Sequence, residues 1–193
     1  MRVPVESNPV VVRVRIDIKS LVANGMAVLR AKWYLRAANR VGQRVRVWGN
    51  PVVKIYNGQL IIGERVRLVS TIAPLELVAN GGTLEIGNGS FINYGSSISA
   101  SQLVRIGDRC TIGTYCMLMD NDFHRLEPEM RQEVPESGSI ILEENVWLGA
   151  RVIVLKGVTI GAGSAIGAGS VVTKSVPPRC LAVGVPAKVI RSI

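Results

Sequence analysis

The chain has 193 residues, enough for one sizeable domain or for one domain with a small appendage. Hydrophobic residues make up 48% of it and charged residues 19%, a composition that excludes an intrinsically disordered protein. The sequence has no run of about 18 apolar residues and no apolar signal-peptide core at its N-terminus, so we expect a cytoplasmic protein without a membrane span.

The net charge of +9 is concentrated in the N-terminal third of the chain. Residues 1–67 hold 13 Lys and Arg against 3 Asp and Glu, a net charge of +10, whereas residues 68–193 hold 10 against 11, a net charge of −1. This asymmetry predicts an anionic partner for the N-terminal region, either a phosphate-bearing substrate or a membrane surface, and we expect no nucleic-acid partner. The alternative is that the basic residues only form a solvated surface.

The N-terminal region, residues 1–44, is predicted to form a basic strand and helix. Residues 10–18 alternate in part and indicate a strand, whereas residues 20–41 indicate a helix that Ser20 caps at its start and Gly42 at its end. The apolar residues of this helix share one stripe at spacings of three and four; they are Val22, Met26, Leu29, Trp33 and Ala37. Two interpretations stay open: the helix covers the open end of the following β-structure, or it rests as a peripheral contact on an anionic bilayer, at the inner membrane face.

A repeat of six residues dominates the rest of the chain. From residue 142 to residue 177, six successive blocks each begin with an aliphatic residue: Leu142, Leu148, Val154, Ile160, Ile166 and Val172. A period of six does not match the 3.6 residues of a helical turn, and a flat strand would not need Gly so often. A strict short period is typical of a solenoid, so we predict an all-β parallel β-helix whose coils each hold three short strands. The spacing recurs from about residue 62, which indicates a solenoid at residues 45–178 and a tail at residues 179–193.

The fifth residue of each block is small or β-branched, and Cys110 and Cys116 fall in this column. Their spacing of six is not that of a common zinc knuckle, so we interpret both as buried packing residues. Cys180 stands alone, and no disulfide framework is predicted.

Residues 119–141 interrupt the repeat with a charged segment. This segment contains Asp120, Asp122 and the only histidine of the chain, His124. An interruption of this length in a repeat array is predicted to be a loop that protrudes from the scaffold, and such loops commonly carry function.

Three phrases carry a resemblance to a known family: VWLGA at residues 146–150, IGAGSVVTK at residues 166–174 and GVPAKVIR at residues 184–191. Together with the hexads they resemble the hexapeptide-repeat acyltransferases, over residues 60–193. The resemblance implies a left-handed parallel β-helix, a homotrimer and the transfer of an acetyl group from acetyl-CoA. The loop ending in Asp-Phe-His-Arg-Leu is most similar to that of sugar O-acetyltransferases, including the galactoside and maltose types and those of surface-polysaccharide biosynthesis.

The resemblance implies that His124 is the catalytic base, and the residue chemistry agrees. A hydroxyl is a poor nucleophile at neutral pH, and histidine is the side chain best suited to accept its proton there. Asp120 or Asp122 would orient the imidazole or bind acceptor hydroxyls. Asn93 lies near the position at which the family has an acceptor-contacting Asn.

The same phrases also contain residues that match the family's contacts to acetyl-CoA. Residues matching the family's pantetheine contacts are Trp147, Gly149, Ala150 and Ala168. Residues matching its contacts to the adenosine end and the phosphates are Thr173, Lys174 and Arg191, with Lys188 close by. Tight packing of the coil also requires small residues at the Gly149 and Ala168 positions.

Three functions stay open on the sequence alone. The first is acetylation of a hydroxyl on a sugar or surface-polysaccharide precursor, with a sugar, nucleotide-sugar or lipid-linked saccharide as acceptor. The second is N-acetylation of an amino-sugar nucleotide, and the third is a non-catalytic solenoid scaffold. A zinc carbonic anhydrase on the same fold would need three histidines, so no metal is expected.

Overall fold

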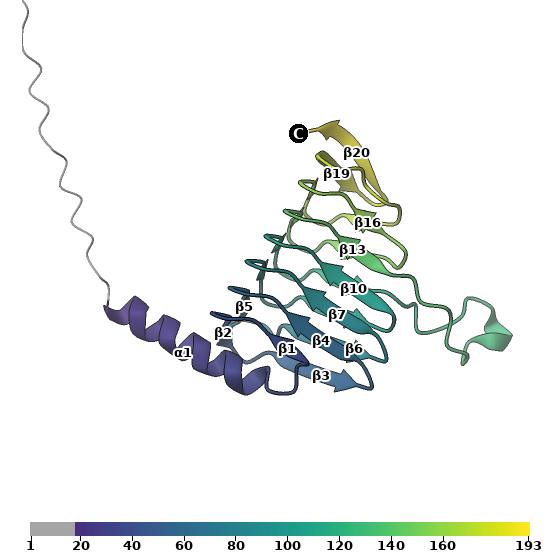
Figure 1. Cartoon of the computed structure of the whole chain (residues 1–193). Coiled ribbons are helices and arrows are strands. Elements are labelled where there is room, and N and C mark those ends of the chain that lie inside the picture. The colour runs from purple at the N-terminus through teal and green to yellow at the C-terminus, as the bar shows by residue number, and fades with distance from the viewer. Residues whose placement is uncertain (1–17) are drawn as a thin grey trace, which may run out of the picture.

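The computed structural model describes residues 18–193, so the strand expected at residues 10–18 lies, except for its last residue, outside the described residues. One helix leads into a tapering solenoid of parallel coils, from which a single loop protrudes (Figure 1). The predicted parallel β-helix is confirmed, since three parallel sheets run along its length.

Each coil contributes one strand to each of three sheets, which we name A, B and C. Sheet A comprises β1 (Arg40–Val41), β4 (Gln59–Ile62), β7 (Thr83–Ile86), β10 (Leu103–Ile106), β13 (Ile140–Leu142) and β16 (Thr159–Ile160). Sheet B comprises β2 (Arg46–Gly49), β5 (Arg67–Ser70), β8 (Phe91–Ile92), β11 (Thr111–Ile112), β14 (Trp147–Leu148), β17 (Ala165–Ile166), β19 (Cys180–Gly184) and β20 (Ala187–Ser192). Sheet C comprises β3 (Val52–Tyr56), β6 (Glu76–Asn80), β9 (Ser97–Ala100), β12 (Met117–Met119), β15 (Ile153–Val154) and β18 (Val171–Val172). The chain therefore turns three corners per coil, which we name AB, BC and CA after the sheets they join.

The first residue of every block points into the solenoid. Leu142 is in register with Ile160, and Leu148 with Ile166, so equivalent aliphatics stack from coil to coil. All four side chains are buried, as the period of six predicts. Burial of one such side chain contributes about 1.5–3 kcal/mol, so this column is the main source of the domain's stability.

The fourth residue of most blocks bends the chain through the left-handed region. Gly163 has a φ of 68° there, but Arg109 and Asn145 adopt 56° and 57° in equivalent places. Glycine is therefore not the only residue that forms these corners, although an L-residue adopts this region at some cost.

The helix α1 (Ile18–Tyr34) packs on the N-terminal end of the solenoid, but not through the expected stripe. Ala27, Ala31 and Leu35 form the buried side of this segment, whereas the stripe that includes Leu29 and Trp33 is exposed. Small alanines let the helix lie close to the first coil, which bulkier side chains would prevent. The helix also ends seven residues before residue 41, because the chain turns there to enter β1.

The two ends of the solenoid match the expected segments only approximately. Parallel pairing already begins with β1, which is in register with β4. At the other end β19 still pairs in parallel with β17, and β20 folds back on β19 as an antiparallel strand (Figure 1). The tail therefore adds two strands to the end of sheet B. Between β12 and β13 the chain leaves the CA corner as the predicted loop, which contains the short 3-10 helix η1 (Pro128–Met130).

Candidate active site

The loop between β12 and β13 is fixed at its base by buried polar side chains. The Asp120 carboxylate, only 1% exposed, accepts hydrogen bonds of 2.7–2.8 Å from the backbone N–H groups of Ser101, Gln102 and Leu103. Asn121 donates to the Pro135 carbonyl at 2.9 Å and so joins the two sides of the loop. Asp120 therefore anchors the loop, and its carboxylate is not available to an acceptor or to the imidazole.

His124 lies on the exposed part of this loop with one ring nitrogen engaged. Its Nδ1 is 3.0 Å from the backbone carbonyl oxygen of Arg131. A carbonyl can only accept a hydrogen bond, so this contact selects the tautomer with the proton on Nδ1 and leaves Nε2 as the unprotonated nitrogen. Phe123, directly before it, has a φ of 63°, an uncommon conformation for a bulky residue that is found more often at functional sites.

Asp122 contacts a lysine, and no contact between its carboxylate and the imidazole is found within residues 18–193. Lys156 Nζ is 2.7 Å from Asp122 Oδ2 and donates to the Glu136 carbonyl at 2.9 Å. These residues and His124 line a hollow of about 400 Å³; the lining residues are Asp122, His124, Arg125, Leu126, Glu127, Pro135, Glu136 and Lys156. The hollow is thus bordered by both carboxylates and cations, which suits a polyhydroxylated molecule.

A second group of predicted residues follows a line across sheet B. Trp147, 58% exposed, is in register with Ala165, which is in register with Leu181, and Leu181 pairs with Arg191 on β20. Adjacent strands lie about 4.8 Å apart, so about 14 Å separates the two ends of this line. Lys188 is on the same strand as Arg191, opposite Val183.

The BC corner beside this line holds Gly149, Ala150 and Ala168. Gly149 is required by packing, since a Cβ there would lie 2.7 Å from the Ala168 nitrogen. Its own backbone is engaged, because its N–H donates to the Ile166 carbonyl at 2.8 Å and its carbonyl accepts from the Cys116 thiol at 3.1 Å. Within residues 18–193, by contrast, the N–H groups of Ala150 and Ala168 have no hydrogen-bond acceptor.

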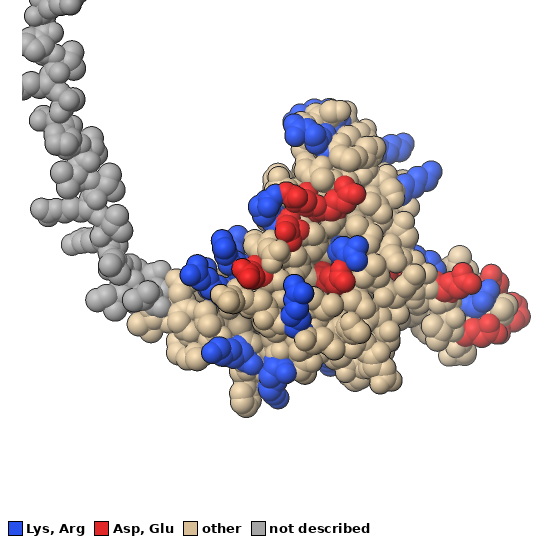
Figure 2. Space-filling view, in the orientation of Figure 1, with Lys and Arg blue, Asp and Glu red and all other residues tan. Residues whose placement is uncertain are grey.

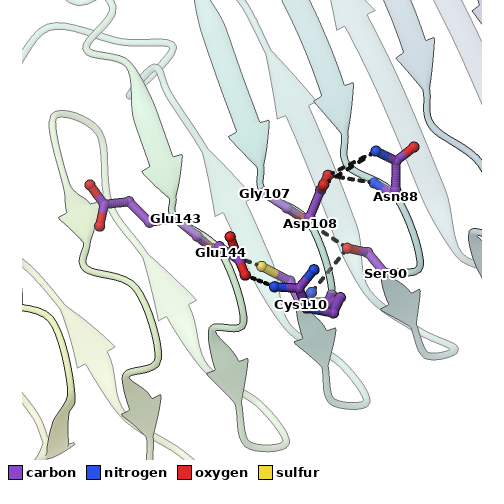
Figure 3. Close-up of polar contacts among 8 residues, drawn as sticks. Asn88, Ser90, Gly107, Asp108, Cys110, Glu143 and Glu144 are labelled. Carbon is purple, nitrogen blue, oxygen red and sulfur yellow. Dashed lines mark hydrogen bonds and ion pairs between the residues drawn. The ribbon is translucent and has the colours of Figure 1, made fainter.

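At the AB corner, side chains accept hydrogen bonds from backbone N–H groups. There a side chain of an adjacent coil accepts from the N–H of the third residue in the block. Asp108 accepts from Asn88 at 2.7 Å (Figure 3), and Glu143 accepts from Ala162 at 2.7 Å. No carboxylate or amide side chain does so for Ala150 or Ala168 in the described part of the chain. The BC corner therefore presents backbone donors to solvent, in a place where an extended ligand could accept from them.

Within one protomer the predicted residues form two separate groups. His124, Asp122, Thr173 and Lys174 belong to the CA corner, the last two directly after β18. The others belong to sheet B and the BC corner; they are Asn93, Trp147, Gly149, Ala150, Ala168, Lys188 and Arg191. The width of sheet C separates the two groups, so a single protomer does not bring His124 to the BC corner.

Cys110 and Cys116 are packing residues, as the repeat predicts. Cys110, Cys116 and Cys180 are buried and free. Burial raises the pKa of the Cys110 and Cys116 thiols, because the charged thiolate would lose its hydration. No group of three His, Cys, Asp or Glu side chains that could hold a metal ion occurs in residues 18–193.

The sequence alone did not identify Arg131, Lys156 or Asn121 as site residues. Arg131 contributes a backbone carbonyl, which no residue type reveals. Lys156 belongs to the regular repeat and reaches Asp122 only because its coil lies beside the loop. Asn121 had a weak signal, since Asn often closes a turn on the backbone two residues on, as it does with the Phe123 N–H at 2.6 Å.

Comparisons with known proteins give consistent results. The family model described as bacterial transferase hexapeptide (six repeats) matches residues 139–174. A galactoside O-acetyltransferase of Escherichia coli is 37% identical over 123 residues, which are 63% of this chain and 60% of that protein. The chain spans 55–60% of the length of the first curated relatives that it matches.

Solved structures extend the likeness over more of the chain. A galactoside acetyltransferase in complex with coenzyme A is 31% identical with a TM-score of 0.63, and the match covers 85% of this chain and 70% of that one. A hexapeptide-repeat acetyltransferase from Vibrio cholerae, complexed with acetyl coenzyme A, is 26% identical with a TM-score of 0.65, and the match covers 93% and 90%.

Proposed function

This chain belongs to the hexapeptide-repeat acetyltransferase family, and from that premise we propose that it transfers an acetyl group from acetyl-CoA to a hydroxyl of a sugar or surface-polysaccharide precursor. The observation that carries the proposal is the His124 ring, whose Nδ1 is bound to the Arg131 carbonyl and whose Nε2 is left as a base. A non-catalytic scaffold has no need of a histidine held in one tautomer on an exposed loop.

In the proposed reaction, His124 Nε2 takes the proton of the acceptor hydroxyl while the hydroxyl oxygen attacks the carbonyl carbon of the thioester. The C–S bond then breaks, and the imidazolium returns the proton to the thiolate of coenzyme A. The Arg131 carbonyl supports this role, because it accepts from Nδ1–H throughout and stabilises the imidazolium that forms between the two steps.

Acetyl-CoA binding is proposed along sheet B and the BC corner. The exposed Trp147 ring offers an apolar wall for the pantetheine arm, and the open N–H groups of Ala150 and Ala168 offer donors to its amide carbonyls. Arg191 and Lys188 supply cations for the phosphates at the end of this line, and Thr173 and Lys174 supply further polar contacts from the CA corner. No metal is needed for this chemistry.

A homotrimer is the assembly that we propose, because it joins the two groups of residues. If the CA corner of one protomer faces the BC corner of the next, the His124 loop meets the proposed cofactor residues and Asn93 of its neighbour. The hollow beside His124, with Asp122 and Lys156, would then receive the acceptor. A hydroxyl acceptor is favoured over an amine, because two curated relatives, each 37% identical to this chain, are named galactoside O-acetyltransferases, and a solved structure that is 31% identical is a galactoside acetyltransferase.

The replacement His124→Asn tests the proposed base. Asn can still donate to the Arg131 carbonyl but cannot accept the acceptor's proton, so we expect kcat/KM to fall by about 10²–10⁴-fold. The measurement is coenzyme A release from acetyl-CoA across a panel of sugar acceptors, with acetyl-CoA affinity followed by calorimetry. Gln132→Ala, on the same exposed loop, is the matched control and should keep full activity.

Two results would contradict different parts of the proposal. An unchanged rate in His124→Asn would show that another group is the base. Failure of the unmodified protein to bind acetyl-CoA in calorimetry would instead remove the transferase function and favour a scaffold.

A further inference from the structure

The outward side of α1 carries an apolar stripe that nothing within residues 18–193 covers. The side chains of Val22, Met26, Leu29 and Trp33 are 60%, 46%, 58% and 65% exposed. At 3.6 residues per turn these four positions fall within an arc of about 60°. Ala27, Ala31 and Leu35 lie opposite them and are buried against the solenoid. The helix is therefore fixed on one side and leaves a bulky apolar surface on the other.

Basic residues border the stripe on both sides. Arg30 and Lys32 are exposed and fall about 70–90° to either side of the centre of the stripe. The guanidinium of Arg36 lies 4.5 Å from the centroid of the Trp33 ring. From residue 18 to residue 63 the chain has eight Lys and Arg and no Asp or Glu, whereas acidic side chains gather on the loop at the far side of the molecule (Figure 2).

We propose that this side of α1 docks on an anionic lipid bilayer, with the stripe in the acyl boundary and the flanking cations at the headgroup phosphates. The pattern is that of an interfacial helix, in which Trp and Leu enter the membrane surface and Lys and Arg stay at its polar edge. No helix within residues 18–193 is long and apolar enough to cross a membrane, so the contact would be peripheral. This proposal does not depend on the acetyl-transfer reaction.

Charge distinguishes a bilayer from a second copy of the chain as the occupant. Two copies meeting through this surface would bring their basic borders together, and like charges oppose such a contact. An anionic bilayer complements the same charges, and each Lys or Arg near its surface adds to the binding. The helix is also rigidly seated, since Arg46 donates to Asn24 at 3.0 Å and Tyr34 to Asn50 at 2.8 Å, so the stripe is presented without further folding.

Vesicle sedimentation of the full chain tests the proposal. We expect binding to vesicles of phosphatidylglycerol and phosphatidylcholine, weaker binding at high salt, and little binding to phosphatidylcholine alone. The double replacement Leu29→Glu with Trp33→Glu should lower partitioning by about tenfold or more, because it places charge in the acyl boundary. Arg30→Ser with Lys32→Ser should weaken binding to the anionic vesicles by about tenfold as well.

A matched control adds the same two charges elsewhere. Val185→Glu with Ile190→Glu changes exposed apolar residues at the opposite end of the solenoid and should bind vesicles like the unmodified protein. Absence of binding to anionic vesicles by the unmodified chain overturns the proposal, and so does unchanged binding in the Leu29/Trp33 variant. Light scattering supplies the other decisive result: an altered oligomeric state in that variant would assign the stripe to a contact between copies.

Discussion

At the scale of single residues, the fifth position of each block shows how a buried polar atom is satisfied. Ser90 Oγ donates to the Gly107 carbonyl at 2.8 Å and accepts from the Cys110 N–H at 3.0 Å (Figure 3). Cys110 continues the same chain of contacts, since its thiol donates to the Glu143 carbonyl at 3.0 Å. Small hydroxyl and thiol side chains thus link successive coils from inside the corner, and this role needs a neutral thiol.

The buried thiols give the protein's stability a dependence on alkaline pH. Burial raises the pKa of Cys110 and Cys116 in the folded state, whereas thiols in the unfolded chain ionise above about pH 8.5. Stability from these groups is therefore complete below that pH and is lost above it, because only the unfolded state gains the ionised form. We expect the urea midpoint to fall more between pH 8 and pH 10 in the unmodified protein than in Cys110→Ser with Cys116→Ser.

Serine already occupies the same column at Ser90 and Ser96, which makes it a fitting replacement. An equal fall of the urea midpoint in both proteins would show that the thiols do not contribute to the alkaline dependence.

At the scale of elements, the strands are only two to five residues long in the solenoid proper, so stability depends on stacking rather than on any one strand. Ile160 on β16 illustrates this, because it is fully buried and lies in register with Leu142 on the preceding coil. Its neighbour Thr159 belongs to the same short strand but faces outward. The two residues therefore separate the effect of a charge inside the coil from that of a charge on its surface.

We expect Ile160→Asp to unfold the protein or make it insoluble. The replacement loses about 1.5–3 kcal/mol of apolar burial, and an unpaired buried carboxylate adds a larger cost. Soluble yield and circular dichroism measure the outcome, with Thr159→Asp as the control that should stay folded. A folded Ile160→Asp protein would mean that the first-position column does not face inward.

The elements also show which parts of the structure the sequence could predict. A period of six requires corners and an inward column, so the coils and the protruding loop followed from spacing alone. The packing side of α1 did not, because Ala27, Ala31 and Leu35 repeat with the same spacing as the bulkier exposed stripe. The face of α1 that packs on the first coil carries small alanines, because the helix lies close to the coil. A prediction from hydrophobicity alone chooses the bulkier stripe on the other face.

The parts of the candidate site that depend on residue type could be proposed from the sequence, whereas the parts that depend on spatial arrangement could not. His124 and the family phrases were identifiable from sequence. The role of Asp120 was not, because three backbone N–H groups some 18 residues upstream occupy its carboxylate. Neither was the separation of His124 from the BC corner, which depends on the order of the sheets around a coil.

At the scale of the whole molecule, this separation predicts a site shared between protomers. Ala168→Trp should block the BC corner, where we propose that the pantetheine arm binds, and His124→Ala should remove the proposed base at the CA corner. If the protein forms the proposed homotrimer, about a quarter of the sites in randomly mixed assemblies of these two variants would combine an intact His124 with an intact BC corner. We therefore expect co-expression to restore roughly a quarter of the activity per site.

Ala162→Trp is the control for that experiment, since it occupies the equivalent place in its block at the AB corner and should stay active alone. Mixed trimers without any activity would locate the complete site within one protomer.

The closure of the loop at its base has a consequence for how such a protein can diversify. The Gly138 N–H donates to the Asp120 carbonyl at 2.8 Å, so the two ends of the loop already meet on the coil. Once the ends are joined, lengthening the segment between them adds little entropic cost, and each doubling costs only about 0.6 kcal/mol. Residues can thus be gained or exchanged at the tip while the repeat stays intact. In the function that we propose, the choice of acceptor can therefore change over generations without any change in the scaffold that would bind acetyl-CoA.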